Sequence, residues 1–295
     1  MKIRIGLSLA AEAEPAGFAA AVDLLERAGV DSLWLSEHVY RDSVDPFTGM
    51  AFALSRTKAL KVGTGVVVLP GRHPVLVAKQ LASLAGLAPK RVLPVFGLRP
   101  ASRAEWAAFP VPEGQRAAVF DESLELLRAL LTQTAPVTFE GKFFQVKDAT
   151  VGPLPEKPLD LWLGGSAPAG LRRAGRFGDG WLGSFMTPGQ AGDAVRAINR
   201  AAAEAGREVD QDHFGMNVGV AFGPLPQAYA ESVARRNPGV KPGELAADGW
   251  AGAKRLIEEF AAVGVSKFVV RPVTPDFPLS EFTDAFTREL LPLQT

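Results

Sequence analysis

The sequence alternates between two hydrophobic periods, and this alternation is the feature that most limits its fold. Short apolar runs such as 32–36 and 61–69 have the length and β-branched content of buried strands, whereas the segments between such runs carry apolar residues at helical spacing. Proline and glycine mark many boundaries, as at Pro15 and Gly29 around the first helical segment. The expected strands are 3–9, 32–36, 61–69, 91–97, 159–163, 180–183, 213–222 and 267–271, and the expected helices are 15–29, 46–55, 73–87, 120–131, 167–177, 187–206, 250–263 and 282–290.

Strands that alternate with helices form parallel sheets with right-handed crossovers. Eight such units in 295 residues predict an α/β fold of the (β/α)8 TIM-barrel type, in one domain that covers residues 1–295. An open doubly wound sheet is the alternative, because the count depends on accepting 180–183 as a strand. Residues 223–248 are rich in proline and glycine and follow the seventh strand. We therefore expect an insertion there, and a lid, at the C-terminal face where barrel enzymes keep their active sites.

Composition removes several classes of function. The chain has no cysteine and three histidines without metal-ligand spacing, so we expect no zinc site, no iron–sulfur cluster and no other metal centre. The 32 basic residues balance 32 acidic residues, which argues against a nucleic-acid partner. No apolar run approaches the length of a membrane span. We expect a cytoplasmic protein with a small-molecule substrate.

The chemistry is then expected at the carboxyl ends of the strands, where side chains from different strands converge. His38 follows the second strand, and a histidine there can move a proton or donate a hydrogen bond to a cofactor ring near neutral pH. A structural histidine in a loop is the alternative. The adjacent Glu37 either contacts a cofactor or anchors a neighbouring loop.

Glycines interrupt the third and fifth strands. Gly63 and Gly65 lie inside an apolar strand, where they mark either the close approach of a flat ligand or packing in a tight barrel. Gly164 and Gly165 end the fifth strand, and Ser166 is expected to cap the helix that comes next. Free backbone N–H groups at such a helix start favour an anion such as phosphate, although an ordinary glycine turn has the same pattern.

Several of these segments together resemble the luciferase-like monooxygenase superfamily of flavin- and deazaflavin-dependent oxidoreductases. The resemblance extends from residue 3 to about residue 272 and depends on the order and spacing of its motifs. They are LWLSEH at 33–38, VGTGVVVLPGRHP at 62–74, AKQ at 78–80, LWLGGS at 161–166, RAGRFGDGW at 173–181, FAAVGV at 260–265 and FVVRP at 268–272.

The resemblance implies a luciferase-like barrel with a cofactor ring at its mouth. A cis peptide bond is expected at Gly65–Val66, beside the ring, and His38 is expected to supply a proton. The expected cofactor-binding residues are Glu37, Thr64, Gly65, Val66, Gly97, Gly164, Gly165, Ser166, Ala167 and Trp181. A homodimer is expected from the relatives alone.

The stretch from Ala85 to Arg91 departs from the common family pattern and is similar to a mainly actinobacterial subgroup of probable coenzyme F420-dependent oxidoreductases. Pro100 stands where sugar-phosphate-oxidising relatives carry an acidic residue, with Glu105 further along, so a sugar-phosphate substrate is not favoured. The predicted function is hydride transfer between F420 and a small organic substrate. The alternatives are an FMN-dependent monooxygenase and a cofactor-binding protein without turnover. Apolar residues at 95, 96, 98 and 106 suggest a hydrophobic pocket wall.

Overall fold

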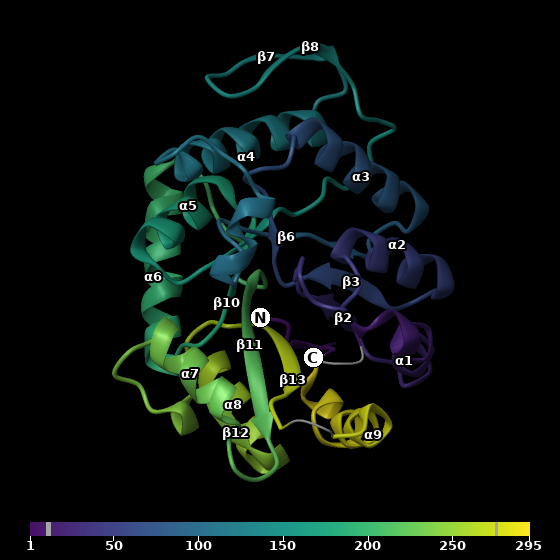
Figure 1. The fold of residues 1–295 in the computed structure, drawn as a ribbon, viewed down its shortest axis with the longest axis vertical. Coiled ribbons are helices and arrows are strands. Elements are labelled where there is room, and N and C mark those ends of the chain that lie inside the picture. Colours follow the sequence, from purple (N-terminus) through teal and green to yellow (C-terminus); the bar gives the residue numbers. More distant parts are fainter. Residues whose placement is uncertain (10–12, 275–276) are drawn as a thin grey trace.

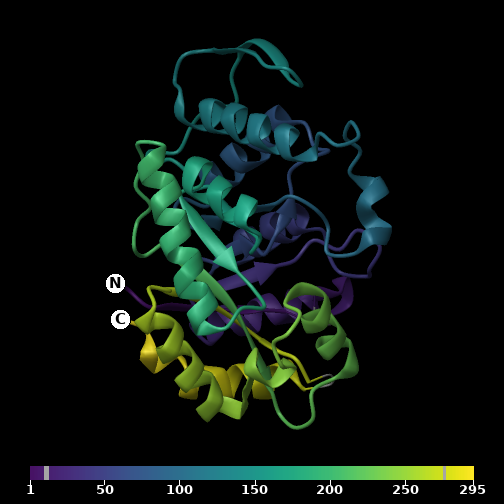
Figure 2. The same cartoon turned by 90° about the vertical axis from the view of Figure 1, so that its left-hand side faces the viewer.

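The computed structural model describes residues 1–9, 13–274 and 277–295. Its principal strands form one parallel sheet, which curls so that the helices lie around its outside (Figures 1 and 2). The sheet strands are β1 (Arg4–Ser8), β2 (Ser32–Leu35), β3 (Lys61–Thr64), β4 (Val67–Val68), β5 (Val92–Leu93), β6 (Val95–Gly97), β9 (Trp162–Gly164), β10 (Gly180–Gly183), β11 (Phe214–Ala221), β12 (Ala246–Asp248) and β13 (Lys267–Pro272).

The helices fall where the apolar spacing places them. Eight of the nine α-helices in the described part of the chain correspond to expected ones, and α7 is an addition within residues 223–248. The α-helices are α1 (Pro15–Arg27), α2 (Pro46–Arg56), α3 (Pro74–Leu87), α4 (Arg116–Thr132), α5 (Pro168–Phe177), α6 (Pro188–Glu204), α7 (Gln227–Arg236), α8 (Gly249–Ala262) and α9 (Leu279–Glu289), with short 3-10 helices at Arg103–Ala108, Pro242–Glu244 and Leu291–Leu293.

The strands pair in the order β4-β6-β9-β10-β11-β13-β1-β2-β3-β5, and β12 pairs with β11. The short run 180–183 is therefore a strand, as predicted, and lies between β9 and β11. Because all these pairs are parallel, the carboxyl ends of the strands share one edge of the sheet. The polar residues that come after β2, β3, β6 and β9 are thereby brought to the same edge.

Two predicted strands are each broken into two. The run 61–69 divides into β3 and β4 at Gly65 and Val66, whose peptide bond is cis, as the resemblance implied. The run 91–97 divides into β5 and β6 at Pro94, which has no backbone N–H to donate to a neighbouring strand. At both breaks the pairing changes partner: β3 pairs with β5, and β4 pairs with β6.

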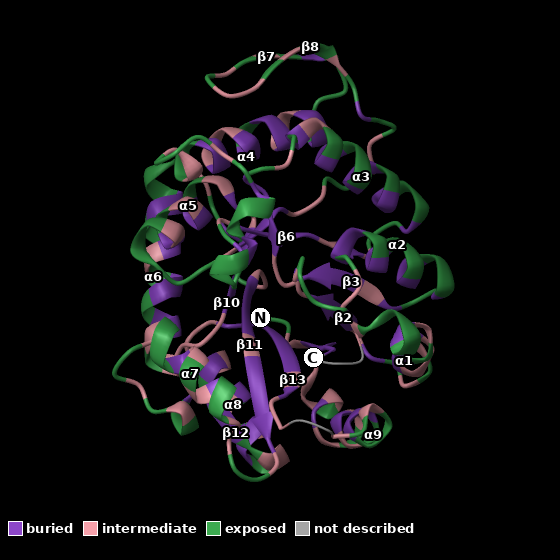
Figure 3. Cartoon of the chain, viewed as in Figure 1, coloured by how far each residue is buried: buried purple, intermediate pink, exposed green. Residues whose placement is uncertain are grey.

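Apolar residues fill the space on both sides of the sheet. The inner faces of the surrounding helices are buried and their outer faces exposed, as Figure 3 shows. A separate cluster of Trp34, Val95, Trp162, Leu182 and Val269 lies inside the curl of the sheet. The hairpin of β7 (Val137–Glu140) and β8 (Gln145–Ala149) projects beyond α4 and is largely exposed (Figures 1 and 3).

The segment 223–248 is more ordered than its composition suggests. It contains α7, the 3-10 helix Pro242–Glu244 and the strand β12, which extends the parallel pairing of β11. The Tyr229 hydroxyl of α7 donates a hydrogen bond of 2.7 Å to the Leu245 carbonyl and ties the segment to itself. No helix within the described residues is long and apolar enough to cross a membrane.

A substitution at Gly63 tests how tightly the side chains pack inside the sheet. A Cβ on Gly63 would come within 2.7 Å of the Trp34 ring and within 3.1 Å of the Leu93 carbonyl oxygen. We expect Gly63→Ala to lower the free energy of unfolding by about 1–3 kcal/mol, because overpacking displaces the indole or the strand. The measurement is the midpoint of urea unfolding. The control Gly86→Ala adds a methyl group to α3 with no atom within 4 Å and is expected to be neutral or stabilising by up to about 1 kcal/mol. Equal midpoints for both variants would contradict this account.

Candidate functional site

The segment Thr64–Val66 is held from both sides at the carboxyl edge of the sheet. On the β2 side, the Gly65 amide donates to the Leu35 carbonyl at 2.7 Å, and the Ser36 hydroxyl donates to the Gly65 carbonyl at 3.0 Å. On the β6 side, the Thr64 hydroxyl donates to the Val95 carbonyl and accepts from the Val95 amide, both at 2.8 Å. The buried Thr64 side chain thus replaces backbone pairing where the strand is interrupted.

The Val66 side chain packs against two of the predicted glycine positions. A Cβ on Gly97 would come within 2.5 Å of Val66 Cγ2, and a Cβ on Gly164 within 2.6 Å of Val66 Cγ1. Both glycines are therefore required by the Val66 side chain, whose methyl groups occupy the space that a larger residue would need. The contact also places the end of β9 directly beside the Gly65–Val66 peptide.

Gly63 and Gly65 differ in their surroundings. Gly63 is buried against Trp34, which is the packing explanation. Gly65 is half-buried, and a Cβ there would meet only Leu182 Cδ2 at 3.8 Å and the Trp34 ring at 4.0 Å. Space therefore remains over Gly65, which favours the approach of a flat ligand at this position.

Glu37 uses both carboxylate oxygens within the protein. Oε2 accepts a hydrogen bond of 2.8 Å from the Val68 amide, and Oε1 forms an ion pair with the guanidinium of Arg72. Arg72 in turn donates to the Val68 carbonyl at 3.1 Å. Burial raises the pKa of the Glu37 carboxyl, although Val68 and Arg72 oppose this shift. These contacts match the loop-anchoring interpretation of Glu37.

The loop after β9 presents backbone N–H groups. Helix α5 begins at Pro168, and Ala167 occupies the N-cap position without a side-chain hydrogen bond. The prediction that Ser166 caps this helix is wrong, because Pro168 has the fixed φ of a first helical residue and so moves the helix start. Gly165 has a φ of 122° and, with Ser166 and Ala167, is exposed. The uncapped helix start carries partial positive charge and can bind an anion.

The Trp181 side chain holds this loop in place by a hydrogen bond. The side chain is fully buried, and its indole N–H donates a hydrogen bond of 2.7 Å to the Gly165 carbonyl. Trp181 thus fixes, through the main chain, the loop of residues 164–167, which we call the glycine loop. Phe185, just beyond the end of the same strand, has a φ of 56° and lies under the guanidinium of Arg236 at 4.7 Å.

His38 lies half-buried at the end of β2 among charged groups. Burial lowers the pKa of the imidazole, the positive charges of Arg41 and Arg236 lower it further, and the negative charge of Glu105 raises it. The ring is therefore held neutral near pH 7, with one nitrogen able to donate and the other to accept.

Sequence reasoning did not assign three functional candidates. Glu105, in the 3-10 helix after β6, is 2% exposed and accepts a hydrogen bond of 3.2 Å from the Tyr40 amide through Oε1. Its Oε2 is buried without a hydrogen-bond partner among the described residues. Arg236 ends α7, and Arg271 lies at the end of β13; burial lowers the pKa of each guanidinium. Arg271 meets the same criterion as His38, a polar residue at a strand end, and could have been found.

The residues expected to form an apolar wall have other roles. Val95 belongs to the cluster inside the sheet, and Phe96 packs in the core between the sheet and the helices. Trp106 is 37% exposed, and its ring contacts the guanidinium groups of Arg99 and Arg103. The expectation was wrong for Val95 and Phe96, because alternate residues of β6 point to opposite faces of the sheet and both faces are packed.

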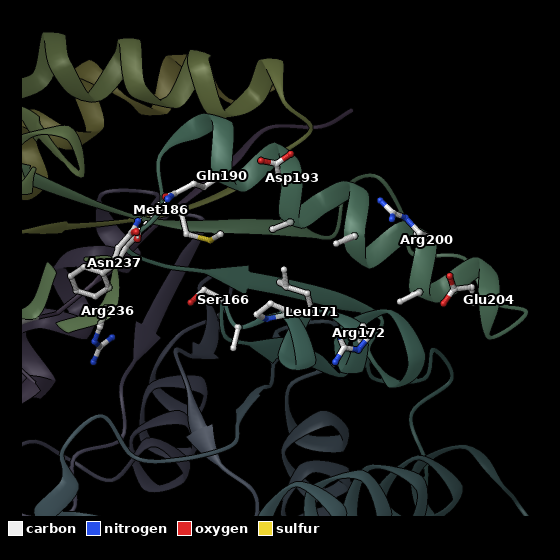
Figure 4. A pocket seen from close by; sticks show the side chains of 16 residues that line it. Ser166, Leu171, Arg172, Met186, Gln190, Asp193, Arg200, Glu204, Arg236 and Asn237 are labelled. Atoms are coloured by element: carbon white, nitrogen blue, oxygen red, sulfur yellow. Dashed lines mark hydrogen bonds between the residues drawn. The ribbon is translucent and has the colours of Figure 1, made fainter. Parts of the chain in front are cut away.

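A cavity of about 740 Å³ extends outward from the glycine loop between α5 and α6 (Figure 4). We call it the α5–α6 groove. Its lining includes Ser166, Ala167, Leu171, Ala194, Ala197 and Ala201, and arginines 172, 200 and 236 stand along it. Within the described residues there is no group of three or more side chains suited to hold a metal ion.

Comparison with known proteins places the chain in a family. A family model described as luciferase-like monooxygenase matches residues 1–264. The chain belongs to this family. The family match includes every strand end described above except that of β13, so the glycine loop and the His38 segment lie within it.

One relative of the chain is the F420-dependent glucose-6-phosphate dehydrogenase of Beutenbergia cavernae, with 33% identity over 191 residues, 61% of this chain and 56% of the relative. The match thus spans little more than half of that protein. A solved F420-dependent secondary alcohol dehydrogenase, in complex with an F420–acetone adduct, has a TM-score of 0.83 at 21% identity and covers 100% of both chains. The FMN complex of the oxygenating constituent of 3,6-diketocamphane monooxygenase from Pseudomonas putida has a TM-score of 0.73 at 17% identity over 100% of this chain and 99% of that one. These structural likenesses show the fold.

His38 predicts a pH dependence of stability. Its pKa in the folded protein lies below its ordinary value of 6.5, so the unfolded chain binds a proton more readily than the folded one. The contribution of His38 is fully present above pH 6.5 and is lost as the pH falls toward the folded-state pKa. We expect wild type to lose more unfolding free energy than His38→Gln between about pH 7.5 and about pH 5. Urea unfolding across this range measures it, and parallel curves would refute the prediction.

Proposed function

We propose that this protein is an oxidoreductase that uses coenzyme F420 and transfers a hydride between the bound deazaflavin and a small organic substrate. The cofactor, when bound, supplies the ring carbon that carries the hydride. The role of the protein is to hold the ring, bind its phosphate, exclude water and move a proton.

The residues present fit such a group. In this proposal the ring lies against Gly65, which is half-buried and has no side chain, and the uncapped start of α5 at Gly165–Ala167 binds the phosphate. The observation that carries the proposal is the contact of Val66 with the Cβ position of Gly164 at 2.6 Å. It makes the ring position and the phosphate position neighbours, as one cofactor molecule requires. Thr64, Gly97 and Trp181 act in this proposal by fixing these segments, and Glu37 by anchoring β4.

His38 is the proposed proton donor and acceptor, and Glu105 is its proposed positioning residue. Glu105 holds the loop after His38 through the Tyr40 amide, and its charge favours the protonated imidazole. Burial and the charge of Arg41 lower the pKa of the imidazole and keep it neutral, whereas the charge of Glu105 raises this pKa and helps the ring to take up a proton during turnover.

The FMN-dependent monooxygenase is the second candidate. The lack of a side chain at Gly65 does not discriminate between the two rings, and the fold is shared with an FMN-bound monooxygenase. Glucose 6-phosphate, the substrate in the name of the relative, is not part of the proposal, because Pro100 replaces the acidic residue expected of sugar-phosphate oxidation.

The proposal includes the finer architecture. We infer a (β/α)8 barrel in a single domain of residues 1–295, in which β3 with β4 and β5 with β6 each count as one strand. The β3–β5 and β4–β6 pairings support closure of the curled sheet. Residues 98–115 and 223–248 are the proposed insertions at the C-terminal face, and 223–248 is the proposed lid, which brings the charge of Arg236 to bear on His38. A cytoplasmic location belongs to the same proposal.

The deciding experiment is a fluorescence titration of the apoprotein with F420 and with FMN. We expect F420 to bind more tightly, and substrate-dependent reduction or oxidation of F420 to accompany binding. Gly65→Ala is expected to weaken F420 binding about tenfold while leaving stability unchanged, because the added methyl group has room in the protein but not beneath a ring. Gly86→Ala is the control. A preference for FMN with oxygen uptake would favour the monooxygenase, and binding of neither by the folded protein would refute the cofactor assignment.

The pairing of Glu105 with His38 has a separate test. Only three histidines are present, so ¹⁵N-labelled histidine spectra resolve His38 once His38→Gln identifies its signals. We expect Glu105→Gln to lower the pKa of His38 and Arg41→Gln to raise it, because each removes one of the opposing charges. Glu113→Gln, an exposed residue of the same connection, is expected to leave it unchanged. A His38 titration unaffected by Glu105→Gln would eliminate the positioning role.

A further inference from the structure

The α5–α6 groove is longer than a phosphate site requires. It begins at Ser166 and Ala167 and runs along α6 from Gln190 to Glu204. At about 1.5 Å per helical residue, this stretch measures about 21 Å. A ligand that ended at its phosphate would fill only the inner end of the groove.

The walls of the groove combine an apolar floor with positive charge. Leu171 from α5 and the alanines of α6 form the floor, and Figure 4 shows Arg172 and Arg200 on the two facing helices. Neither guanidinium forms an ion pair within the described part of the chain. Of the two acidic residues along the groove, Asp193 is paired with Arg196 at 2.6 Å, which leaves Glu204 at the outer end.

Hydrogen bonds fix the inner end of the groove. The Asn237 amide donates to the Gln190 side chain at 2.6 Å and to the Phe185 carbonyl at 3.0 Å. Gln190 also closes the capping box of α6 with Thr187. The groove is therefore preformed between fixed elements, with Arg236 beside it, and is continuous with the anion-binding start of α5.

We propose that the α5–α6 groove binds an anionic chain that continues beyond the cofactor phosphate, with Arg172 and Arg200 contacting its carboxylates. The inference rests on the proposed function and deepens it. F420 carries a lactyl group and several glutamates beyond its phosphate, whereas FMN ends there. A length of about 21 Å leaves room for an extended chain of several groups beyond the phosphate. The groove thus distinguishes the two candidate cofactors by the chain attached to the phosphate.

The test compares two ligands with the same ring and phosphate: F420 bearing its glutamates and the deazaflavin 5′-phosphate obtained by removing the tail. Fluorescence titration of the apoprotein gives both dissociation constants. Wild type is expected to bind F420 about tenfold more tightly, and the advantage is expected to decrease with salt because exposed charges are screened. The double variant Arg172→Gln/Arg200→Gln is expected to lose most of this advantage and to bind the 5′-phosphate as wild type does.

The control is Arg176→Gln/Arg255→Gln, which removes two exposed arginines, from α5 and α8, that lie outside the groove. It is expected to keep the full preference for F420. Equal affinity of wild type for the two ligands, or an unchanged preference in the groove variant, would overturn the inference while leaving the proposed function intact. Failure of wild type to bind either ligand would overturn both.

Discussion

Backbone hydrogen bonding across the break between β3 and β4 is the interaction on which the rest of the site depends. A parallel sheet satisfies its buried amides through neighbouring strands, and an interruption leaves polar groups that need other partners. Here the Thr64 hydroxyl, the Ser36 hydroxyl and the main chain of β2 supply them. The break is therefore a fixed feature, and it creates both the space over Gly65 and the position of Val66 against the next strand ends.

Charged side chains also shape the properties of this edge of the sheet. The buried carboxylate of Glu37 is neutralised locally by Arg72, whereas Arg236 and Arg271 carry no ion pair within the described residues. The balanced net charge of the whole chain conceals this local excess of positive charge. An edge of this kind attracts anionic ligands, and the charges of Arg41 and Arg236 add to burial in lowering the pKa of His38.

Much of the fold could be predicted from the sequence, because period and boundary residues act locally. The eight strand segments, including the short run 180–183, lie where the pattern places them, and the cis bond at Gly65–Val66 was expected from the family motif. Pro94 carried a signal of the second strand break. Helix α7 was not predicted. The four-residue spacing of Tyr229 and Val233 is typical of a helix, but the surrounding prolines and glycines indicated a loop.

The part of the site that could not be predicted depends on distant contacts. Glu105 is significant only because its carboxylate reaches the Tyr40 amide, 65 residues away in the sequence. Ser166 was assigned a cap by residue type, but the neighbouring Pro168 decided the helix start. Gly97 and Gly164 were associated with a ligand, and the structure shows that Val66 needs their lack of a side chain. A glycine pattern records that space is required without indicating which group occupies it.

The Asn237 amide has a mechanical consequence. Its hydrogen bonds to Gln190 and to the Phe185 carbonyl connect the end of α7 with the capping box of α6 and with the chain that leaves β10. A displacement of α7 alone would break these bonds. We therefore expect α7 and the first turn of α6 to move together. A shift of α7 would therefore also displace the start of α6, which lines the inner end of the α5–α6 groove.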